Sequence, residues 1–250
     1  MRLALLSDIH GECFLLDQVL VDIQRQGIEQ IVCLGDALQG GSQPAETLAR
    51  LRELQCPVVM GNADAWLVTG KETSMTESIS EKQREVRVWS LSQLTANDLA
   101  FVQQHFQPTI EIALEAGKSL LCFHGSPHSF DDTIFPSTPD DTVRQLLSGV
   151  DATLLAGGHT HTQQMRRLGN SWYINSGSVS LAYNWELSNM ETGHIRVDPW
   201  SDYAIVSSEG ACLGITFRHV PFDVEKLAQM IRSSGRPYAE EFIALYQREN

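Results

Sequence analysis

Short apolar runs that stop at a metal-binding side chain are the feature that most constrains this chain. Each of five such runs is followed closely by Asp, Asn or His: 3–6 before Asp8 and His10, 31–34 before Asp36, 58–60 before Asn62, 120–123 before His124, and 154–156 before His159 and His161. Continuous apolar runs of this length indicate strands buried on both faces. Because the carboxyl ends of neighbouring strands share one edge of a sheet, we expect these seven side chains to meet there.

The first third of the chain alternates these runs with helical patterns. Apolar side chains recur at helical spacing over 14–23, Gly27 ends that pattern, and a second helical pattern precedes the run at 58–60. This order predicts a βαβαβ unit with parallel strands and right-handed crossovers.

Residues 64–107 carry no strand signal and are predicted to form two or three helices. Ser78 with Glu81, and Thr95 with Asp98, have the spacing of capping boxes. A chain of 250 residues is long enough to bury one large core. We therefore expect one domain over 1–250, with a helical insertion at about 64–107.

Strand patterns dominate much of the second half of the chain. An antiparallel pair is expected over 109–123 with its turn at 115–117, and a helix is expected to start at Thr138-Pro139. Further strands are predicted at 153–156, 163–168, 172–175, 194–197, 203–207 and 212–219. The final stretch, 223–249, is predicted to be an amphipathic helical segment.

Charge and cysteine content bear on partners and compartment. The chain has 18 Lys and Arg against 31 Asp and Glu, a net charge of −13. Such a surface repels phosphate backbones and anionic lipid, so neither non-specific nucleic-acid binding nor membrane docking is expected. The five cysteines lack metal-ligand spacing, and the first apolar run is too short for a signal peptide. These features predict a cytoplasmic protein.

The seven side chains have the chemistry of a two-metal site. Asp8 and His10 alternate along an extended segment and can hold one ion together, and His159 and His161 repeat that spacing. Asp36 has two carboxylate oxygens and a full charge, so it can bridge two cations. This donor set suits Mn, Fe, Zn, Co or Ni, of which we favour Mn. Two such ions acidify a bridging water to hydroxide, which attacks phosphorus in a phosphate ester.

The motifs resemble those of the calcineurin-like metallophosphoesterase superfamily, in the same order, over residues 1 to about 180. The resemblance implies an α/β fold, a two-sheet β-sandwich flanked by helices in four αββα layers. It implies one metal held by Asp8, His10, Asp36 and His161, and a second held by Asp36, Asn62, His124 and His159. It implies that Asp36, Asn62 and His124 are the catalytic residues.

Two departures from the superfamily point to its small bacterial phosphodiesterases. Ala63 stands where many members have a histidine that protonates the leaving group, and alanine donates no proton. The Asp-Arg-Gly of protein phosphatases is absent after Asp36. We therefore predict a phosphodiesterase that prefers acidic leaving groups. Asp64 is a candidate to hold either Asn62 or a water molecule next to the metal ligands.

Two other functions stay open at this level. The same site would serve a phosphomonoesterase or a nucleotide polyphosphatase. A non-catalytic metal-binding scaffold of the same fold is the other alternative, although the full set of seven ligands argues against it. Glu12 is expected to contact phosphate or to cap the next helix, and His128 is expected to be a loop histidine. The oligomeric state is left open, with a homodimer through 181–215 as one form.

Overall fold

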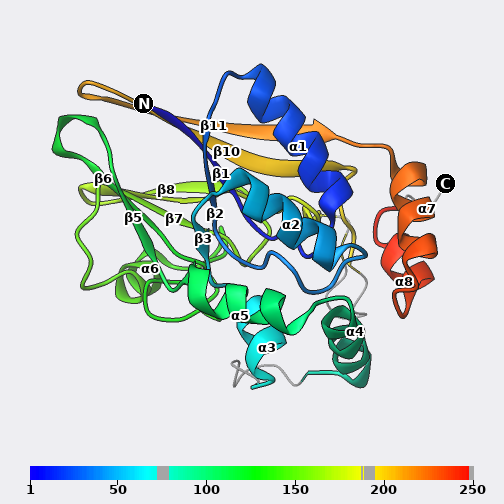
Figure 1. Ribbon diagram of the computed structural model, residues 1–250. Helices are drawn as coiled ribbons and strands as arrows, with labels where there is room; N and C mark the ends of the chain where they lie inside the picture. The colour runs from blue at the N-terminus through cyan, green and yellow to red at the C-terminus, as the bar shows by residue number, and fades with distance from the viewer. Residues whose placement is uncertain (72–78, 187, 189–194, 248–250) are drawn as a thin grey trace.

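Two sheets pack face to face in the computed structural model, which describes residues 1–71, 79–186, 188 and 195–247 (Figure 1). The larger sheet has the order β11 (Cys212–Pro221), β10 (Trp200–Glu209), β1 (Arg2–Leu6), β2 (Gln30–Cys33), β3 (Val58–Val59) and β4 (Phe106–Gln107). The smaller sheet has the order β5 (Ile110–Ala113), β6 (Ser119–Cys122), β7 (Leu154–Gly157), β9 (Ser171–Asn175) and β8 (Gln164–Leu168).

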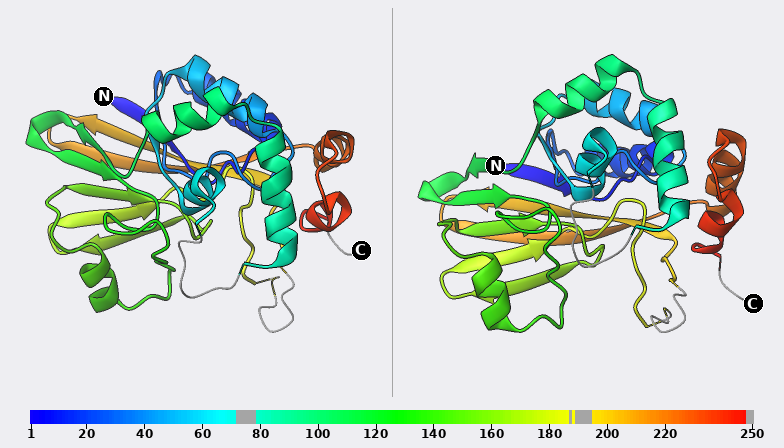
Figure 2. Two further views of the ribbon diagram at one scale, coloured as in Figure 1. Left: turned by 60° about the horizontal axis from the view of Figure 1, so that its bottom comes forward. Right: turned by 90° about the horizontal axis from the view of Figure 1, so that it is seen from below.

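Helices cover the outer face of each sheet, so the predicted four-layer sandwich is confirmed (Figures 1 and 2). Helices α1 (Cys13–Arg25) and α2 (Pro44–Leu54) lie on the larger sheet, and α6 (Asp140–Leu146) lies on the smaller one. Three apolar clusters separate the layers. In β1, Ala4 and Leu6 pack under the helices, whereas Leu3 and Leu5 pack against the other sheet. This alternation follows from the two-residue period of a strand.

The predicted βαβαβ unit is present. Strand β1 pairs in parallel with β2, and β2 pairs in parallel with β3. In the smaller sheet β6 and β7 are also parallel. Strands β1, β2 and β3 therefore end at one edge of the larger sheet, and β6 and β7 end at one edge of the smaller sheet. The loops after β1 and β7 meet, since the His159 amide donates to Asp8 Oδ2.

Two or three helices were predicted over 64–107, and the described residues there form three: α3 (Asn62–Thr69), which begins two residues earlier, α4 (Glu81–Ser92) and α5 (Ala96–His105). Thr95 and Asp98 form the predicted capping box of α5. Ser78 lies outside the described residues, and α4 is instead capped by Ser80 with Gln83. Strand β4 was not predicted, because a two-residue strand is too short to show a period.

Three predicted elements differ from the structure. The C-terminal stretch is two helices, α7 (Val224–Ser234) and α8 (Ala239–Ala244), because Gly235 ends α7 in a left-handed conformation with φ of 77°. The predicted strand at 194–197 is reduced to a bridge between Val197 and Tyr183, and residue 194 lies outside the described ranges. Helix α6 begins one residue later than expected, with Pro139 at its N-cap position.

The predicted turn of the β5–β6 hairpin is confirmed, as a short 3-10 helix, η1 (Glu115–Gly117). Across the ranges that the structure describes, no helix has both the length and the apolar character needed to cross a bilayer.

Candidate metal centre

The structure brings all seven predicted ligands together at the carboxyl ends of the strands. Backbone hydrogen bonds tie their loops to one another: the Asp8 amide donates to Gly35 O at 3.0 Å, and the His10 amide donates to Asp36 O at 2.8 Å. Across the two sheets, the His159 amide donates to Asp8 Oδ2 at 3.0 Å. The loops of both sheets are therefore fixed against each other at the site.

The ligand loops share an unusual backbone. Five of the candidate ligands have φ between 47° and 70°, the left-handed region that side chains rarely adopt: Asp8, His10, Asp36, His159 and His161. Such geometry persists only where the surroundings enforce it, and it is common at functional sites.

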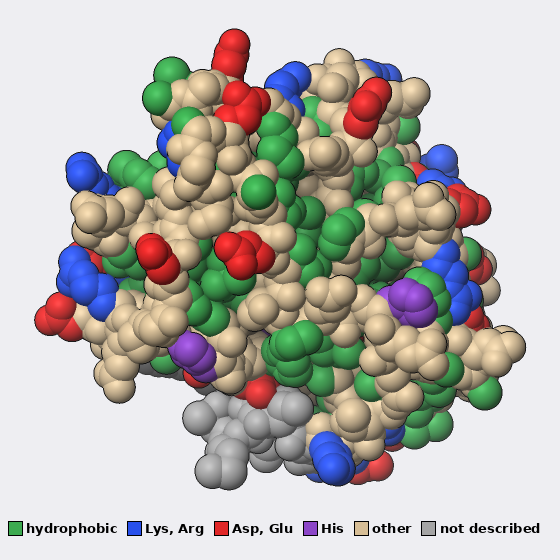
Figure 3. Space-filling view, turned by 60° about the vertical axis from the view of Figure 1, so that its left-hand side comes forward, with side chains coloured by type: hydrophobic (Ala, Val, Ile, Leu, Met, Phe, Trp, Pro, Cys, Tyr) green, Lys and Arg blue, Asp and Glu red, His purple; other side chains and the backbone are tan. Residues whose placement is uncertain are grey.

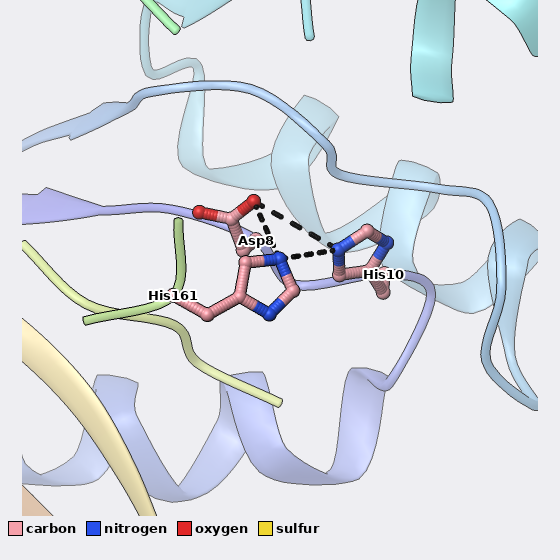
Figure 4. A group of neighbouring side chains, drawn as sticks. All are labelled: Asp8, His10 and His161. Atoms are coloured by element: carbon pink, nitrogen blue, oxygen red, sulfur yellow. Dashed lines mark hydrogen bonds and ion pairs between the residues drawn. The ribbon is translucent and has the colours of Figure 1, made fainter. Parts of the chain in front are cut away.

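Asp8, His10 and His161 form the first group of ligands (Figure 4). Asp8 Oδ1 lies 3.1 Å from His161 Nε2 and 3.8 Å from His10 Nε2. The two Nε2 atoms lie 3.2 Å apart. His10 Nδ1 faces Gln39 O at 2.8 Å, and His161 Nδ1 faces Leu181 O at 3.1 Å. Each Nδ1 must then carry the proton, so both Nε2 atoms present lone pairs to the same point.

Asp36, His124 and His159 form the second group, with the ligand atoms within 4.8 Å of one another. His124 Nδ1 faces Leu34 O at 2.8 Å, which leaves Nε2 toward the group. Asn62 Oδ1 lies 3.0 Å from this Nε2.

Asp36 lies between the two groups. Its Oδ2 is 3.4 Å from His124 Nε2 and 3.9 Å from His10 Nε2. Its Oδ1 accepts a hydrogen bond from the Ala63 amide at 2.8 Å. One carboxylate therefore faces both sets of ligands.

The electrostatics of the site favour positive charge. Burial disfavours ionisation of both carboxyls, but neighbouring histidines outweigh it: His161 holds the pKa of Asp8 well below its usual range, and His124 lowers that of Asp36 to about 2. Burial lowers the pKa of His159 to about 4, so this ligand is neutral. Burial also opposes protonation of His124, yet the two aspartates raise its pKa to about 10.

An orphaned oxygen indicates that these residues fit a metal. Asp8 is fully buried, and its Oδ1 has no hydrogen-bond partner among the described residues. A buried ionised oxygen without a partner is costly. In the neutral rings of His10 and His161, both Nε2 atoms face this oxygen with lone pairs and cannot donate to it, whereas a protonated His161 can. A cation at this point satisfies all three.

Two residues next to the ligands, Asp64 and Glu12, hold neighbouring loops. Asp64 accepts hydrogen bonds from the Ala37 and Leu38 amides at 3.0–3.1 Å, so it holds the loop after Asp36. Glu12 occupies the N-cap position of α1 but makes no cap there. Its carboxyl accepts from the amide and the hydroxyl of Ser42, both at 2.9 Å.

The ring atom Nε2 of His128 lies 2.7 Å from the carbonyl oxygen of Ser148. This contact is consistent with the loop histidine that we expected.

Several residues at the site were missed from the sequence. A cavity of about 590 Å³ opens over the ligands and is also lined by Lys82, Arg236, Tyr238 and Phe242. The last three lie more than 70 residues beyond His161. The local signal is Gly235, which is followed by Arg236 and, after one proline, by Tyr238.

Comparison with known proteins identifies the class. A model of the calcineurin-like phosphoesterase superfamily domain matches residues 1–192. The chain therefore belongs to this superfamily, whose members are metal-dependent phosphoesterases.

Relatives support the fold over nearly the whole chain. The chain is 28% identical over 181 residues to the uncharacterized protein MJ0912 of Methanocaldococcus jannaschii, covering 72% of this chain and 70% of that protein. A metallophosphoesterase from Sphaerobacter thermophilus has a TM-score of 0.75 at 22% identity, covering 98% and 97% of the two chains. The hypothetical protein PH1004 of Pyrococcus horikoshii has a TM-score of 0.80 at 17% identity, covering 98% of each.

Proposed function

We propose that this protein hydrolyses phosphodiesters with the aid of two divalent metal ions. The observation that carries the proposal is the position of Asp36. Its Oδ2 faces His10 of one ligand group at 3.9 Å and His124 of the other at 3.4 Å. A carboxylate placed between two such groups supports a dinuclear centre, because its two oxygens and full charge can serve two cations.

Each side chain has a role in this proposal. Asp8, His10, Asp36 and His161 would hold one ion, and Asp36, Asn62, His124 and His159 would hold the other. Two bound ions would supply an acidified water and positive charge against the phosphate oxygens. Imidazole with carboxylate and amide oxygen suits transition metals, and Mn is our first choice.

The protein's own contribution is orientation. Backbone carbonyls fix the rings of His10, His124 and His161 through Nδ1. The Ala63 amide fixes one oxygen of Asp36, so its other oxygen stays directed at the ligand groups. Such fixed partners typically contribute about 10–100-fold to metal affinity or activity.

Ala63 favours substrates whose leaving group departs without being protonated. It lines the cavity next to Asn62 and has no proton to give. We therefore propose that esters with acidic leaving groups, such as aryl diesters, are cleaved best, and that alkyl monoesters are poor substrates.

The test combines metal analysis with turnover. Protein purified without chelator is assayed for bound metal, then for hydrolysis of bis(p-nitrophenyl) phosphate and p-nitrophenyl phosphate after Mn addition. We expect about two metals per chain and faster cleavage of the diester. Faster cleavage of the monoester would favour a phosphomonoesterase, and tight metal binding without any hydrolysis would favour the scaffold.

A matched pair of variants assigns the activity to the site. Asp36→Asn keeps the shape but loses the charge that balances two cations, so we expect a loss of at least about 100-fold in kcat/KM. Asp141→Asn is the control, since the Asp141 side chain is fully exposed on α6. Equal activity of the two variants would contradict the proposed site.

A further inference from the structure

The cavity over the ligands is larger than the proposed chemistry needs. Its volume is about 590 Å³, and His10, Asp36 and His159 line one part of it. Cavities of roughly 300–1,000 Å³ hold drug-sized organic ligands, whereas a phosphate group fills only a small part of such a space. The remaining volume is available to an organic substituent of the ester.

The wall away from the metal ligands is built by α4 and the C-terminal helices, which lie side by side (Figure 2). Lys82 Nζ of α4 lies 2.6 Å from Glu241 Oε2 of α8, and 5.1 Å from the ring centroid of Tyr238. These contacts join α4 to the C-terminal helices, and the C-terminal helices lie beyond residue 192, where the match to the superfamily domain ends.

The surface of this wall is aromatic. Tyr238 and Phe242 line the cavity from the C-terminal side, and Trp66 of α3 lines it next to Asn62 and Ala63. Tyr183 lines it as well, and its ring stacks on the ring of His161 with centroids 4.5 Å apart. Aromatic rings in the lining of a cavity suit a planar ligand group, because stacking on aromatic faces is favourable for every nucleobase.

Arg236 adds a fixed hydrogen-bond donor to the aromatic wall. Its Nε donates to Gly40 O at 2.6 Å, and its Nη1 donates to Pro237 O at 2.7 Å. The guanidinium carbon lies 4.1 Å from the centroid of the Phe242 ring. Nη2 has no hydrogen-bond partner in the described part of the chain. A guanidinium held in this way is preorganised for stacking and for donation to an acceptor on a ligand.

We propose that this wall binds the non-leaving ester arm of the substrate, and that this arm is a nucleoside. The inference rests on the proposed phosphodiesterase function and names its substrate class: a nucleoside phosphodiester. Aromatic faces take the base, and Arg236 donates to an acceptor on the base or sugar. Tyr238 and Arg236 are the specificity-determining residues. A small alkyl arm would leave this surface without a partner.

Two esters with the same leaving group test the proposal. Thymidine 5′-(p-nitrophenyl phosphate) and methyl p-nitrophenyl phosphate both release p-nitrophenolate, so their kcat/KM ratio reports on the non-leaving arm alone. We expect the nucleoside ester to be preferred by at least about tenfold, the size of one stacking contact with a base. A ratio near one would overturn the proposal.

Variants locate the preference on the wall. Arg236→Gln removes the guanidinium, and Tyr238→Asn removes the ring while tolerating the left-handed φ of 57° at that position. In each variant we expect the ratio of kcat/KM for the nucleoside ester to kcat/KM for the methyl ester to fall at least about fivefold. Cleavage of the methyl ester reports whether the metal site is still intact. The control is Arg232→Gln, because Arg232 lies on the same helical pair but is bonded to Glu240 outside the cavity. An unchanged ratio in both wall variants would overturn the assignment.

A binding measurement separates this inference from the proposed function. Calorimetric titration compares thymidine 5′-monophosphate with methyl phosphate in the Mn-loaded protein. Tighter binding of the nucleotide, lost in Arg236→Gln, would support the subsite even if neither ester were hydrolysed. Equal binding of the two would reject the subsite even if both esters were hydrolysed.

Discussion

Left-handed backbone geometry at five candidate ligands concentrates strain in a few residues. Each such residue costs about 1–3 kcal/mol, which the surrounding packing must offset. Two glycines allow the ligand loops to pack at close range. A Cβ on Gly61 would collide with Asp36 Oδ1 and with the Asp36 amide, and a Cβ on Gly158 would collide with Ser7 Oγ. The absence of side chains at these two positions lets the ligand loops approach each other.

We predict that Gly61→Ala damages the site more than the fold. The added methyl group meets the backbone of Asp36, which cannot rotate away as a side chain can. A displacement of about 1 Å at a catalytic group costs about 100-fold in rate, so we expect a loss of this size in kcat/KM. The measurement is aryl diester hydrolysis with Mn, together with the thermal unfolding midpoint.

Gly214→Ala is the control for this substitution. Its Cβ would meet the Ser207 hydroxyl on the neighbouring strand, which can rotate away. We expect the activity of this variant to stay close to that of the parent. Activity of Gly61→Ala within about threefold of the parent would show that Asp36 tolerates displacement, contrary to its proposed role.

Ala63→His tests the missing proton donor. A histidine at this position would face the cavity that Ala63 lines and could protonate a leaving alkoxide. We predict that rates become less sensitive to the leaving-group pKa, with the largest gain for alkyl esters. The measurement is kcat/KM across a series of aryl and alkyl diesters. An identical slope in variant and parent would rule out our account of Ala63.

At the scale of elements, the sequence correctly predicted the helices and strands that a local pattern defines. Apolar runs located the strands, and the ends of these strands indicated that Asp8, Asp36 and His124 lie close together. Capping boxes such as Thr95 with Asp98 located helix starts. These signals lie within a few residues, so a single sequence reveals them.

Elements defined by distant contacts were not predictable in this way. Strand β4 exists only because Phe106 and Gln107 pair with β3, and neither residue carries a pattern of its own. The helix break at Gly235 was missed because the amphipathic period continues on both sides of it. The approach of Arg236 to Gly40 joins positions 196 residues apart, and no sequence period reports such a contact.

A side-chain contact between β10 and β11 predicts a pH-dependent stability. Asp202 is 4% exposed, accepts from His219 Nδ1 at 2.7 Å and lies near Asp198. Burial raises the pKa of Asp202 to about 7. Between its ordinary pKa and this value, the unfolded chain releases the proton that the folded chain retains, so stability falls as pH rises from about 4 to 7.

We expect Asp202→Asn to remove this loss of stability with rising pH. The unfolding midpoint of the variant minus that of the parent should increase from pH 4.5 to pH 8, by an amount equivalent to at most about 4 kcal/mol in the free energy of unfolding. Other titrating groups are common to both proteins and cancel in the difference. The measurement is thermal unfolding of both proteins across this pH range, with Asp141→Asn as control. A difference that is flat with pH would contradict the raised pKa.

At the scale of the whole molecule, an acidic protein carries a site built to attract cations. Acidic and basic side chains are interspersed on the face in Figure 3, so the net charge of −13 is not gathered into one patch there. Weak non-specific nucleic-acid binding stays a prediction from this charge. The excess of carboxylates also favours the approach of divalent cations over that of free anions.

The two sheets meet at the ligands, so metal binding should stabilise the whole sandwich. Asp8 and Asp36 come from the larger sheet, whereas His124 and His161 come from the smaller one. Free metal at 100 times its Kd adds about 2.7 kcal/mol to the free energy of unfolding, which raises the unfolding midpoint of a chain this long by roughly 5–10 °C. We predict this rise on Mn addition to chelator-treated protein, and less than half of it in Asp36→Asn, whose amide cannot balance two cations. Calorimetric scans of both proteins check the result, and an equal rise in the two would show that the metal stabilises the fold without using Asp36.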